Sequence, residues 1–191
     1  MDFEYWNSHV HFRLKYPLTK TQKNGNIRTL MNHIINCLVE NKPGVLARIV
    51  GLISGRGYNI ETLNVAPTAD PTVSKMTIVV PGDARVIEQV TRQLAKQVDV
   101  IEVVNMTNLR HLDRELILVR VGAENHSSRV EVLELASLFK ARVVGVQEDS
   151  VTIEMAGNQE TVSDFLHLLK PYRIIDISRT GVIAVGRENA Q

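Results

Sequence analysis

Two short segments of this chain carry residue types suited to binding a small carboxylate. Residues 38–46 contain the run Asn41-Lys42-Pro43-Gly44, and residues 57–60 contain Asn59. We predict that a strand enters the Pro-Gly turn and continues as an amphipathic helix, whose N-terminus presents unpaired N–H groups and the positive end of the helix dipole. Asn41 and Asn59 are predicted to lie at strand–loop junctions that face each other. Such a pocket suits a free amino acid, and it indicates a protein that senses a metabolite rather than transforming one.

The helix N-terminus supplies the predicted contacts to the carboxylate. The backbone N–H groups of Gly44, Val45 and Leu46 are expected to be free to donate to it. Gly44 has no side chain and therefore allows close approach of the backbone. Pro43 is expected in the first helical turn, where its missing N–H costs little. These four residues form the anion-binding part of the predicted site.

The other predicted site residues recognise the rest of an amino acid. The amide oxygens of Asn41 and Asn59 can accept hydrogen bonds from an ammonium group. Val45 and Ile60 are expected to contact a branched aliphatic side chain. Each asparagine, taken alone, has an equally good structural explanation, because Asn41 can cap the helix and Asn59 can be tolerated in the loop. Both explanations stay open at the level of the sequence.

Residues for catalysis or metal binding do not form a recognisable set in this sequence. The segment Gly55-Arg56-Gly57 ends a predicted helix and lacks the third glycine of a dinucleotide-binding loop. His111 with Asp113, and His9 with His11, have no further ligands at a useful spacing. No nucleophile is paired with a candidate base. We therefore predict no catalytic residue, no metal ligand and no cofactor bound by this chain.

Composition and charge exclude several other classes of protein. The 191 residues are 44% hydrophobic and 23% charged, which fits one large or two small globular domains. A net charge of +1 with interspersed signs argues against a nucleic-acid partner. No apolar run approaches the ~20 residues of a membrane span, and the acidic start of the chain argues against a secretory signal. The single cysteine, Cys37, lies in an apolar segment and predicts a small buried side chain in a reducing, cytoplasmic compartment.

From residue 33 onward the apolar pattern is regular and predicts one small domain. Strands are expected over residues 33–40, 59–66, 74–80 and 100–106, with helices over 43–56 and from the capping residue Asp83 onward. Gly57 suits the left-handed position that follows a helix. The second helix is expected to bury Val86, Ile87, Val90, Leu94 and Val98. The order β-α-β-β-α-β is the ferredoxin-like arrangement, in which both helices cover one face of an antiparallel sheet.

The same order of elements recurs after a polar linker at residues 108–114. Strands are expected over residues 115–121, 141–146, 150–156 and 174–178, with residues 181–185 extending the last one. A capping box from Ser128 to Glu131 is predicted to open the third helix, and the fourth is expected over 160–170. The predicted fold class is therefore α+β, with two tandem ferredoxin-like βαββαβ domains over residues 32–107 and 115–187.

Residues 1–31 differ from the rest of the chain and are predicted to be an extension. They mix aromatic, histidine and lysine residues without helical or strand periodicity. We expect this extension to be poorly ordered.

The face of the first sheet without helices is predicted to be apolar. It is expected to carry Ile34, Leu38, Ile60, Val79 and Val104. An apolar uncovered face in a small domain favours pairing with a second copy of the chain, because burial contributes ~25 cal/mol per Å². We therefore predict a homodimer through this domain.

The same residues resemble those of a known family. Residues 39–46, Val-Glu-Asn-Lys-Pro-Gly-Val-Leu, resemble the opening of an ACT domain, a module that senses small molecules. Residues 51–68, 74–78, 114–119 and 177–182 closely resemble the small regulatory subunits of acetolactate synthase. The likeness covers residues 32–187 and the order of both domains, an N-terminal ACT domain and a C-terminal ACT-like domain.

The resemblance implies a regulatory role and a catalytic partner. The implied partner is a large subunit that carries thiamine diphosphate, Mg²⁺ and FAD, while this chain activates it and confers feedback inhibition by valine, or by leucine or isoleucine. Asn41, Gly44, Asn59 and Ala66 match the family's effector site between the two ACT domains of a dimer. The chain carries the two-domain unit once, as bacterial or plastid-encoded forms do, which implies the cytoplasm or the plastid stroma. The alternative is an ACT-type amino-acid sensor of a different enzyme or of a transcriptional partner.

Overall fold

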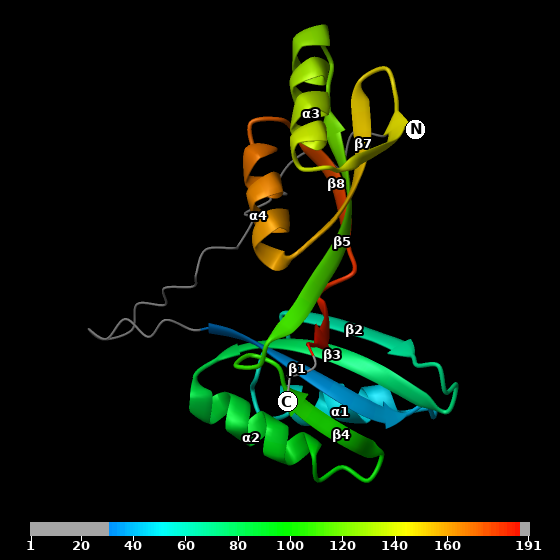
Figure 1. Cartoon of the computed structure of the whole chain (residues 1–191), viewed down its shortest axis with the longest axis vertical. Helices are drawn as coiled ribbons and strands as arrows, with labels where there is room; N and C mark the ends of the chain where they lie inside the picture. Colours follow the sequence, from blue (N-terminus) through cyan, green and yellow to red (C-terminus); the bar gives the residue numbers. More distant parts are fainter. Residues whose placement is uncertain (1–30, 188–191) are drawn as a thin grey trace, which may run out of the picture. The chain divides into compact units, whose positions relative to one another are not determined.

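The first unit of the chain is a four-stranded antiparallel sheet covered on one face by two helices. We obtained a computed structural model, which describes residues 31–187 (Figure 1). The elements of this unit are β1 (Met31–Glu40), α1 (Val45–Ser54), β2 (Thr62–Pro67), β3 (Val73–Gly82), α2 (Ala84–Leu94) and β4 (Val100–Asn105). The strand order β2-β3-β1-β4 is that of the ferredoxin-like fold. The predicted fold of this unit is confirmed.

The second unit repeats the arrangement and adds one strand. Its elements are β5 (His111–Gly122), α3 (His126–Leu138), β6 (Arg142–Val146), β7 (Ser150–Gly157), α4 (Gln159–Leu168), β8 (Ile174–Arg179) and β9 (Ile183–Gly186). The strands follow the order β6-β7-β5-β8, and β9 pairs with the first part of β5. None of the helices within residues 31–187 has the length and apolarity needed to cross a membrane.

The segment between the two units is mostly strand. Residues 108–114 were expected to be a linker, but His111–Arg114 form the start of β5 and pair with β9, His111 opposite Gly186 and Arg114 opposite Ile183. Residues 181–185 do not continue β8, because the chain turns at Gly181, which has a positive φ of 73°. The polar sequence of residues 108–114 did not indicate a strand, because the strand it pairs with, β9, is distant along the chain. Met31, assigned above to the extension, begins β1, and residues 1–30 lie outside the described range.

The core of the first unit follows the predicted alternation along the strands. Ile35, Cys37 and Val39 are buried, and the inner residues of β3 and α2 pack on them. Asp83 caps α2 as predicted, because its carboxylate accepts the N–H groups of the second and third helical residues. Val98, expected in this core, is 91% exposed. Val98 was expected to be buried because it follows Leu94 by four residues, which is one helical turn. The helix ends at Leu94, so Val98 is not on its buried face.

The start of α3 differs from the predicted capping box. The N-cap is Asn125, whose side chain accepts from the N–H of Ser128, and Glu131 accepts instead from the hydroxyl of Ser127. The helix begins at His126, so Ser128 is its third residue rather than its cap. Short polar side chains at adjacent positions compete for this role, and the sequence alone did not distinguish them.

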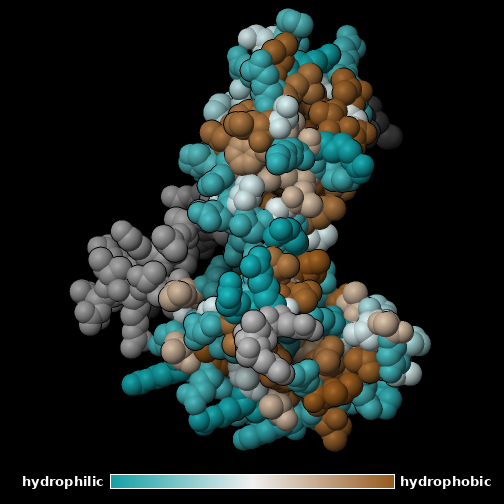
Figure 2. All heavy atoms as spheres, viewed as in Figure 1, coloured by the Kyte–Doolittle hydropathy of each residue, from teal (hydrophilic) through white to brown (hydrophobic). Residues whose placement is uncertain are grey.

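Apolar side chains remain at the surface of both units, and Figure 2 shows them on one face of the molecule. Leu116 and Leu118 on β5 are among the exposed apolar residues of the second unit.

The outer face of the first sheet is partly covered by the chain itself. Asn36, buried on this face, donates from Nδ2 to the carbonyl oxygen of Ala184 at 2.9 Å and accepts from the Thr77 hydroxyl at 2.9 Å. Val79 is fully buried, and Ile60 packs on the helix side of the sheet, contrary to its predicted place on the outer face. This face is therefore less available to a second chain than the sequence suggested, and the homodimer stays a prediction.

The lone cysteine behaves as a buried apolar side chain. Cys37 lies on the inner face of β1 with no exposed surface. Burial raises the pKa of its thiol from 9.0 to about 12, because the thiolate would lose its hydration. The predicted structural role of Cys37 is confirmed.

We predict that Asn36→Ala destabilises the protein by about 2 kcal/mol or more. The change leaves the buried Ala184 carbonyl and the Thr77 hydroxyl without their partner. Urea unfolding of the full chain measures the effect. Asn64→Ala is the control, because that half-buried side chain makes one long, solvent-exposed bond of 3.4 Å and its loss should cost less than about 0.5 kcal/mol. Equal losses in the two variants would contradict the role given to Asn36.

Candidate functional site

A tight turn joins β1 to α1 and sets the geometry of the candidate site. The N–H of Val45 donates to the carbonyl of Lys42 at 3.3 Å, with Pro43 and Gly44 between them. Gly44 has φ 86° and ψ −13°, which makes this a type II turn with proline and glycine at their favoured positions. Because a residue in the left-handed region cannot be helical, α1 begins at Val45. Pro43 therefore precedes the helix rather than occupying its first turn, as the sequence had suggested.

The helix N-terminus keeps part of its predicted donor set. The N–H of Val45 is used by the turn, so it is not free for a ligand. Among residues 31–187 the N–H groups of Gly44 and Leu46 have no hydrogen-bond acceptor, and no side chain caps the helix. Unpaired donors at this end of a helix attract an anion. Two of the three predicted donors are therefore free, and carboxylate binding at this helix end stays a prediction.

Asn41 fixes the turn to the loop between β2 and β3. Its Nδ2 donates to the carbonyl of Pro71 at 2.9 Å, and its backbone N–H donates to the carbonyl of Thr72 at 2.7 Å. It does not cap α1, so the structural alternative considered for Asn41 is wrong. Its amide oxygen has no partner within the described residues and can accept from an ammonium group.

A cavity of about 210 Å³ lies between the N-terminus of α1 and the edge strand β2. Asn41, Val45, Leu46 and Ala66 line it, which brings together four of the predicted site residues. Its other walls include the side chains of Val39, Val65, Ser74 and Met76. Most of these walls are apolar. Glu40, Asn41 and Lys42 add polar groups just before α1, and Ser74 adds one on β3. This division of polar and apolar groups suits a small amino acid with an aliphatic side chain.

Asn59 and Ile60 lie away from this cavity within one chain. They follow the far end of α1, a ten-residue helix about 15 Å long. The strand expected from residue 59 begins only at Thr62, because Gly57 ends the helix with φ 75° and the chain uses the next residues to return to the sheet. Asn41 and Asn59 therefore do not face each other in the monomer.

Arg48 is a candidate site residue that the sequence analysis missed. A Cβ built on Gly44 would lie 3.9 Å from the guanidinium of Arg48, so this cation lies beside the helix N-terminus. Arg48 is held there by the largely buried carboxylate of Asp99, with 2.5 Å between Nη1 and Oδ2. The sequence could have indicated this, because Arg48 follows Gly44 by four residues and residues at that spacing lie on the same face of a helix. At the turn itself, a hydrogen bond from Lys42 to Glu40 raises the pKa of the exposed lysine.

The other candidate ligands of the sequence have structural contacts. His33 lies 3.2 Å from the Thr107 hydroxyl and 3.3 Å from the Gly82 carbonyl, and Asp113 accepts from the backbone N–H of Gln159. No group of three or more His, Cys, Asp or Glu residues in the described part of the chain could hold a metal ion. The pair His9 and His11 lies outside the described residues.

Comparisons with known proteins match both units. A family model described as the small subunit of acetolactate synthase matches residues 114–188, and an acetolactate-synthase-type ACT domain model matches residues 35–102. A probable acetolactate synthase small subunit of Archaeoglobus fulgidus is 47% identical over 83% of this chain and 99% of its own. The acetolactate synthase small subunit of Haemophilus influenzae is 45% identical over 82% and 96%. The crystal structure of the small subunit from Thermotoga maritima has a TM-score of 0.76 and 31% identity, covering 84% and 99%.

We predict opposite effects of one substitution at two glycines of this region. Gly44→Ala should destabilise the protein by about 1 kcal/mol, because alanine is strained at φ 86° although nothing crowds its methyl group. Gly51→Ala, in the middle of α1 with no atom within 4 Å of the new Cβ, should stabilise it by about 0.5–1 kcal/mol. Thermal or urea unfolding measures both, and a stabilising Gly44→Ala would rule out the left-handed turn.

Proposed function

Because this chain belongs to the family of acetolactate synthase small subunits, we propose that it binds a branched-chain amino acid and relays that binding to a catalytic large subunit. It raises the activity of the large subunit and makes it sensitive to feedback inhibition by valine, or by leucine or isoleucine. The observation that carries this proposal is the cavity beside α1, which joins a helix N-terminus with free N–H groups to an apolar wall.

The cavity matches the parts of valine in size and chemistry. Its volume of about 210 Å³ is below the roughly 300–1,000 Å³ of pockets for drug-sized ligands, which fits a small amino acid. The N–H groups of Gly44 and Leu46, with Arg48 beside them, bind the carboxylate. The amide oxygen of Asn41 accepts from the ammonium group. Val45 and Ala66 contact the aliphatic side chain.

A homodimer through the ACT domains would complete this site. The cavity borders β2, which is an edge strand and offers unpaired backbone groups to another chain. A second copy placed along this edge covers the open side of the cavity and brings its own Asn59 to the ligand. The exposed position of Asn59, far from Asn41 in one chain, supports this role.

Regulation follows if the dimer has two arrangements that bind the large subunit differently. Effector bound between two ACT domains favours the arrangement that supports less activity. A coupling free energy of ~1–3 kcal/mol is enough for feedback control of this kind. Thiamine diphosphate, Mg²⁺ and FAD belong to the large subunit in this proposal, and the absence of catalytic residues from this chain stays a prediction, as does its place in the cytoplasm or plastid stroma.

The alternative function is an ACT-type sensor that regulates a different enzyme or a transcriptional partner. Family membership favours the acetolactate synthase complex. Reconstitution with a large subunit distinguishes the two, because only the proposed function predicts an increase in acetolactate formation.

We predict that calorimetric titration of the full chain shows saturable binding of valine, leucine or isoleucine. Asn41→Ala should weaken that binding about tenfold, because it removes the acceptor for the ammonium group and releases the turn from Pro71. Asn108→Ala, a change at an exposed asparagine outside the cavity, is the control and should bind like the parent chain. Equal affinities of the two variants would exclude Asn41 from the site.

In the reconstituted enzyme we predict that Gly44→Asp abolishes inhibition by valine and leaves activation intact. A carboxylate at this position repels the carboxylate of the effector and occupies its place. Gly44→Ala has the same backbone strain without the charge, so it should retain most of the inhibition. Ala66→Leu should also weaken inhibition, because it fills the apolar wall. A Gly44→Asp enzyme that stays fully sensitive to valine would show that the effector binds elsewhere.

A further inference from the structure

A groove with a volume of about 540 Å³ lies between α3 and α4 of the second unit. Figure 1 shows these two helices on the same side of their sheet. The rings of Phe139 and Phe165, with centroids 5.2 Å apart, join the end of α3 to α4. Both helices and the segment after α4 contribute to the groove, which is lined by Glu131, Glu134, Leu135, Leu138, Leu168 and Tyr172.

The leucines of this groove are open to solvent. Leu138 is 73% exposed, Leu168 is 42% exposed, and Leu135 is only partly buried. The helix α3 already buries Val132 and Ala136 in the core, so Leu135 and Leu138 form a second apolar face on the same helix. An exposed apolar surface rimmed by charged residues is typical of an interaction site.

Two carboxylates give the groove a negative charge. Glu131 accepts from the Tyr172 hydroxyl at 2.7 Å and from the Ser127 hydroxyl at 3.1 Å. Glu134 has no ion pair or side-chain hydrogen bond within residues 31–187, and no lysine or arginine of that range lines the groove. The hydrogen bond to Glu131, together with desolvation and the charges of both glutamates, raises the pKa of Tyr172. The groove therefore suits an occupant that combines apolar side chains with positive charge.

The first 30 residues of this chain carry that combination. Residues 5–30 contain five lysines and arginines and no aspartate or glutamate. Five of the chain's nine Phe, Trp and Tyr residues lie within the first 16 residues. The two features coincide at residues 12–16, Phe-Arg-Leu-Lys-Tyr, where three large apolar or aromatic side chains are interspersed with two cations. This run is complementary to the groove in both polarity and charge.

We propose that residues 12–16 bind in the groove between α3 and α4 of the same chain. The aromatic and leucine side chains of this run cover the three leucines of the groove, and its two cations pair with Glu131 and Glu134. The long stems of arginine and lysine let their charged ends reach carboxylates beside an apolar surface. The volume of the groove is in the range of pockets for drug-sized ligands, so it accommodates a few side chains rather than a whole domain.

The length of the intervening chain favours docking within one molecule. Residues 17–30 connect the run to β1, and an extended chain of that length spans up to about 45 Å. A small domain is about 30 Å across. A tethered segment has an effective concentration in the roughly millimolar range, so a weak contact is enough to hold it. The proposal does not depend on the function proposed above.

The test is paramagnetic NMR of the full chain with one cysteine added next to the docking run. Thr19→Cys carries a nitroxide label, which attaches selectively because Cys37 is fully buried and the pKa of its thiol is raised to about 12. We expect the label to broaden the backbone amide signals of Leu135, Leu138 and Tyr172. The same sample after reduction of the nitroxide gives the reference intensities.

Charge reversal tests the contact itself. The double variant Glu131→Lys, Glu134→Lys, made in the labelled chain, should lose the broadening, because it replaces attraction to the cations of the run by repulsion. Adding Arg13→Glu and Lys15→Glu to this variant should restore the broadening, since opposite charges then meet again. Restoration by the second pair of changes is a result that mere damage to α3 does not produce.

A matched control reverses two charges elsewhere in the second unit. Glu124→Lys, Glu148→Lys makes the same change of charge at exposed positions outside the groove and should keep the broadening. Equal loss of broadening in the two double variants would contradict the proposal, because the effect would then depend on net charge alone.

Two other results would also overturn it. One is the absence of broadening in the groove with the label at Thr19→Cys and, in a second variant, at Gln22→Cys. The other is broadening that occurs only in a mixed sample, where spin-labelled chains act on isotope-labelled chains without a nitroxide. That result would make a second copy of the chain the occupant of the groove.

Discussion

The buried amide of Asn36 is the contact on which the course of the chain depends. It lies on β1, an inner strand of the first sheet, and both of its polar atoms are satisfied, one by Thr77 and one by the carbonyl of Ala184. A buried amide left without a partner costs about 1–3 kcal/mol, so this contact favours the return of the segment around Ala184 to β1. The same segment leaves β8 at Gly181 and pairs along the start of β5. It also joins the first sheet to the strand that continues into the second unit.

A second constraint, the left-handed conformation of Gly44, determines the candidate effector site. The type II turn at Pro43 and Gly44 uses the N–H of Val45, starts the helix one residue after the glycine and leaves other donors unpaired. Asn41 is then free to hold the β2–β3 loop, and Arg48 lies over the helix end. The backbone conformation therefore determines where the free N–H donors of the candidate site lie. The side chains around them supply its charge and its apolar wall.

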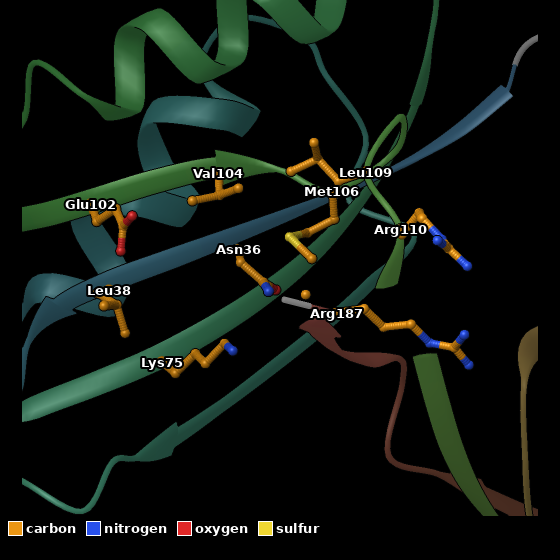
Figure 3. Close-up of a pocket in the computed structure, with 10 residues that line it drawn as sticks. Asn36, Leu38, Lys75, Glu102, Val104, Met106, Leu109, Arg110 and Arg187 are labelled. Atoms are coloured by element: carbon orange, nitrogen blue, oxygen red, sulfur yellow. The ribbon is translucent and has the colours of Figure 1, made fainter. Parts of the chain in front are cut away.

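The strand β1 contributes to two cavities through the alternation of its side chains. Its inward residue Val39 lines the cavity beside α1, and its outward residues Asn36 and Leu38 line another, of about 250 Å³, near the end of β9 (Figure 3). Met76, in the first cavity, precedes Thr77, the partner of Asn36, on the neighbouring strand β3. The alternation of side chains along β1 therefore decides which of its residues face each cavity.

The sequence by itself determined the α+β class, the repeated order of elements and the inner faces of the strands, because these follow from local periodicity. It also determined the turn at Pro43 and Gly44, because proline and glycine have special dihedral angles. Only the tertiary structure decided which distant groups meet. It placed Asn59 away from Asn41, exposed Val98, paired residues 111–114 with β9 and brought Arg48 to the site. Pairing between segments about 70 residues apart leaves no local periodicity. The position of an N-cap depends on which of several neighbouring polar side chains accepts from the free backbone N–H groups.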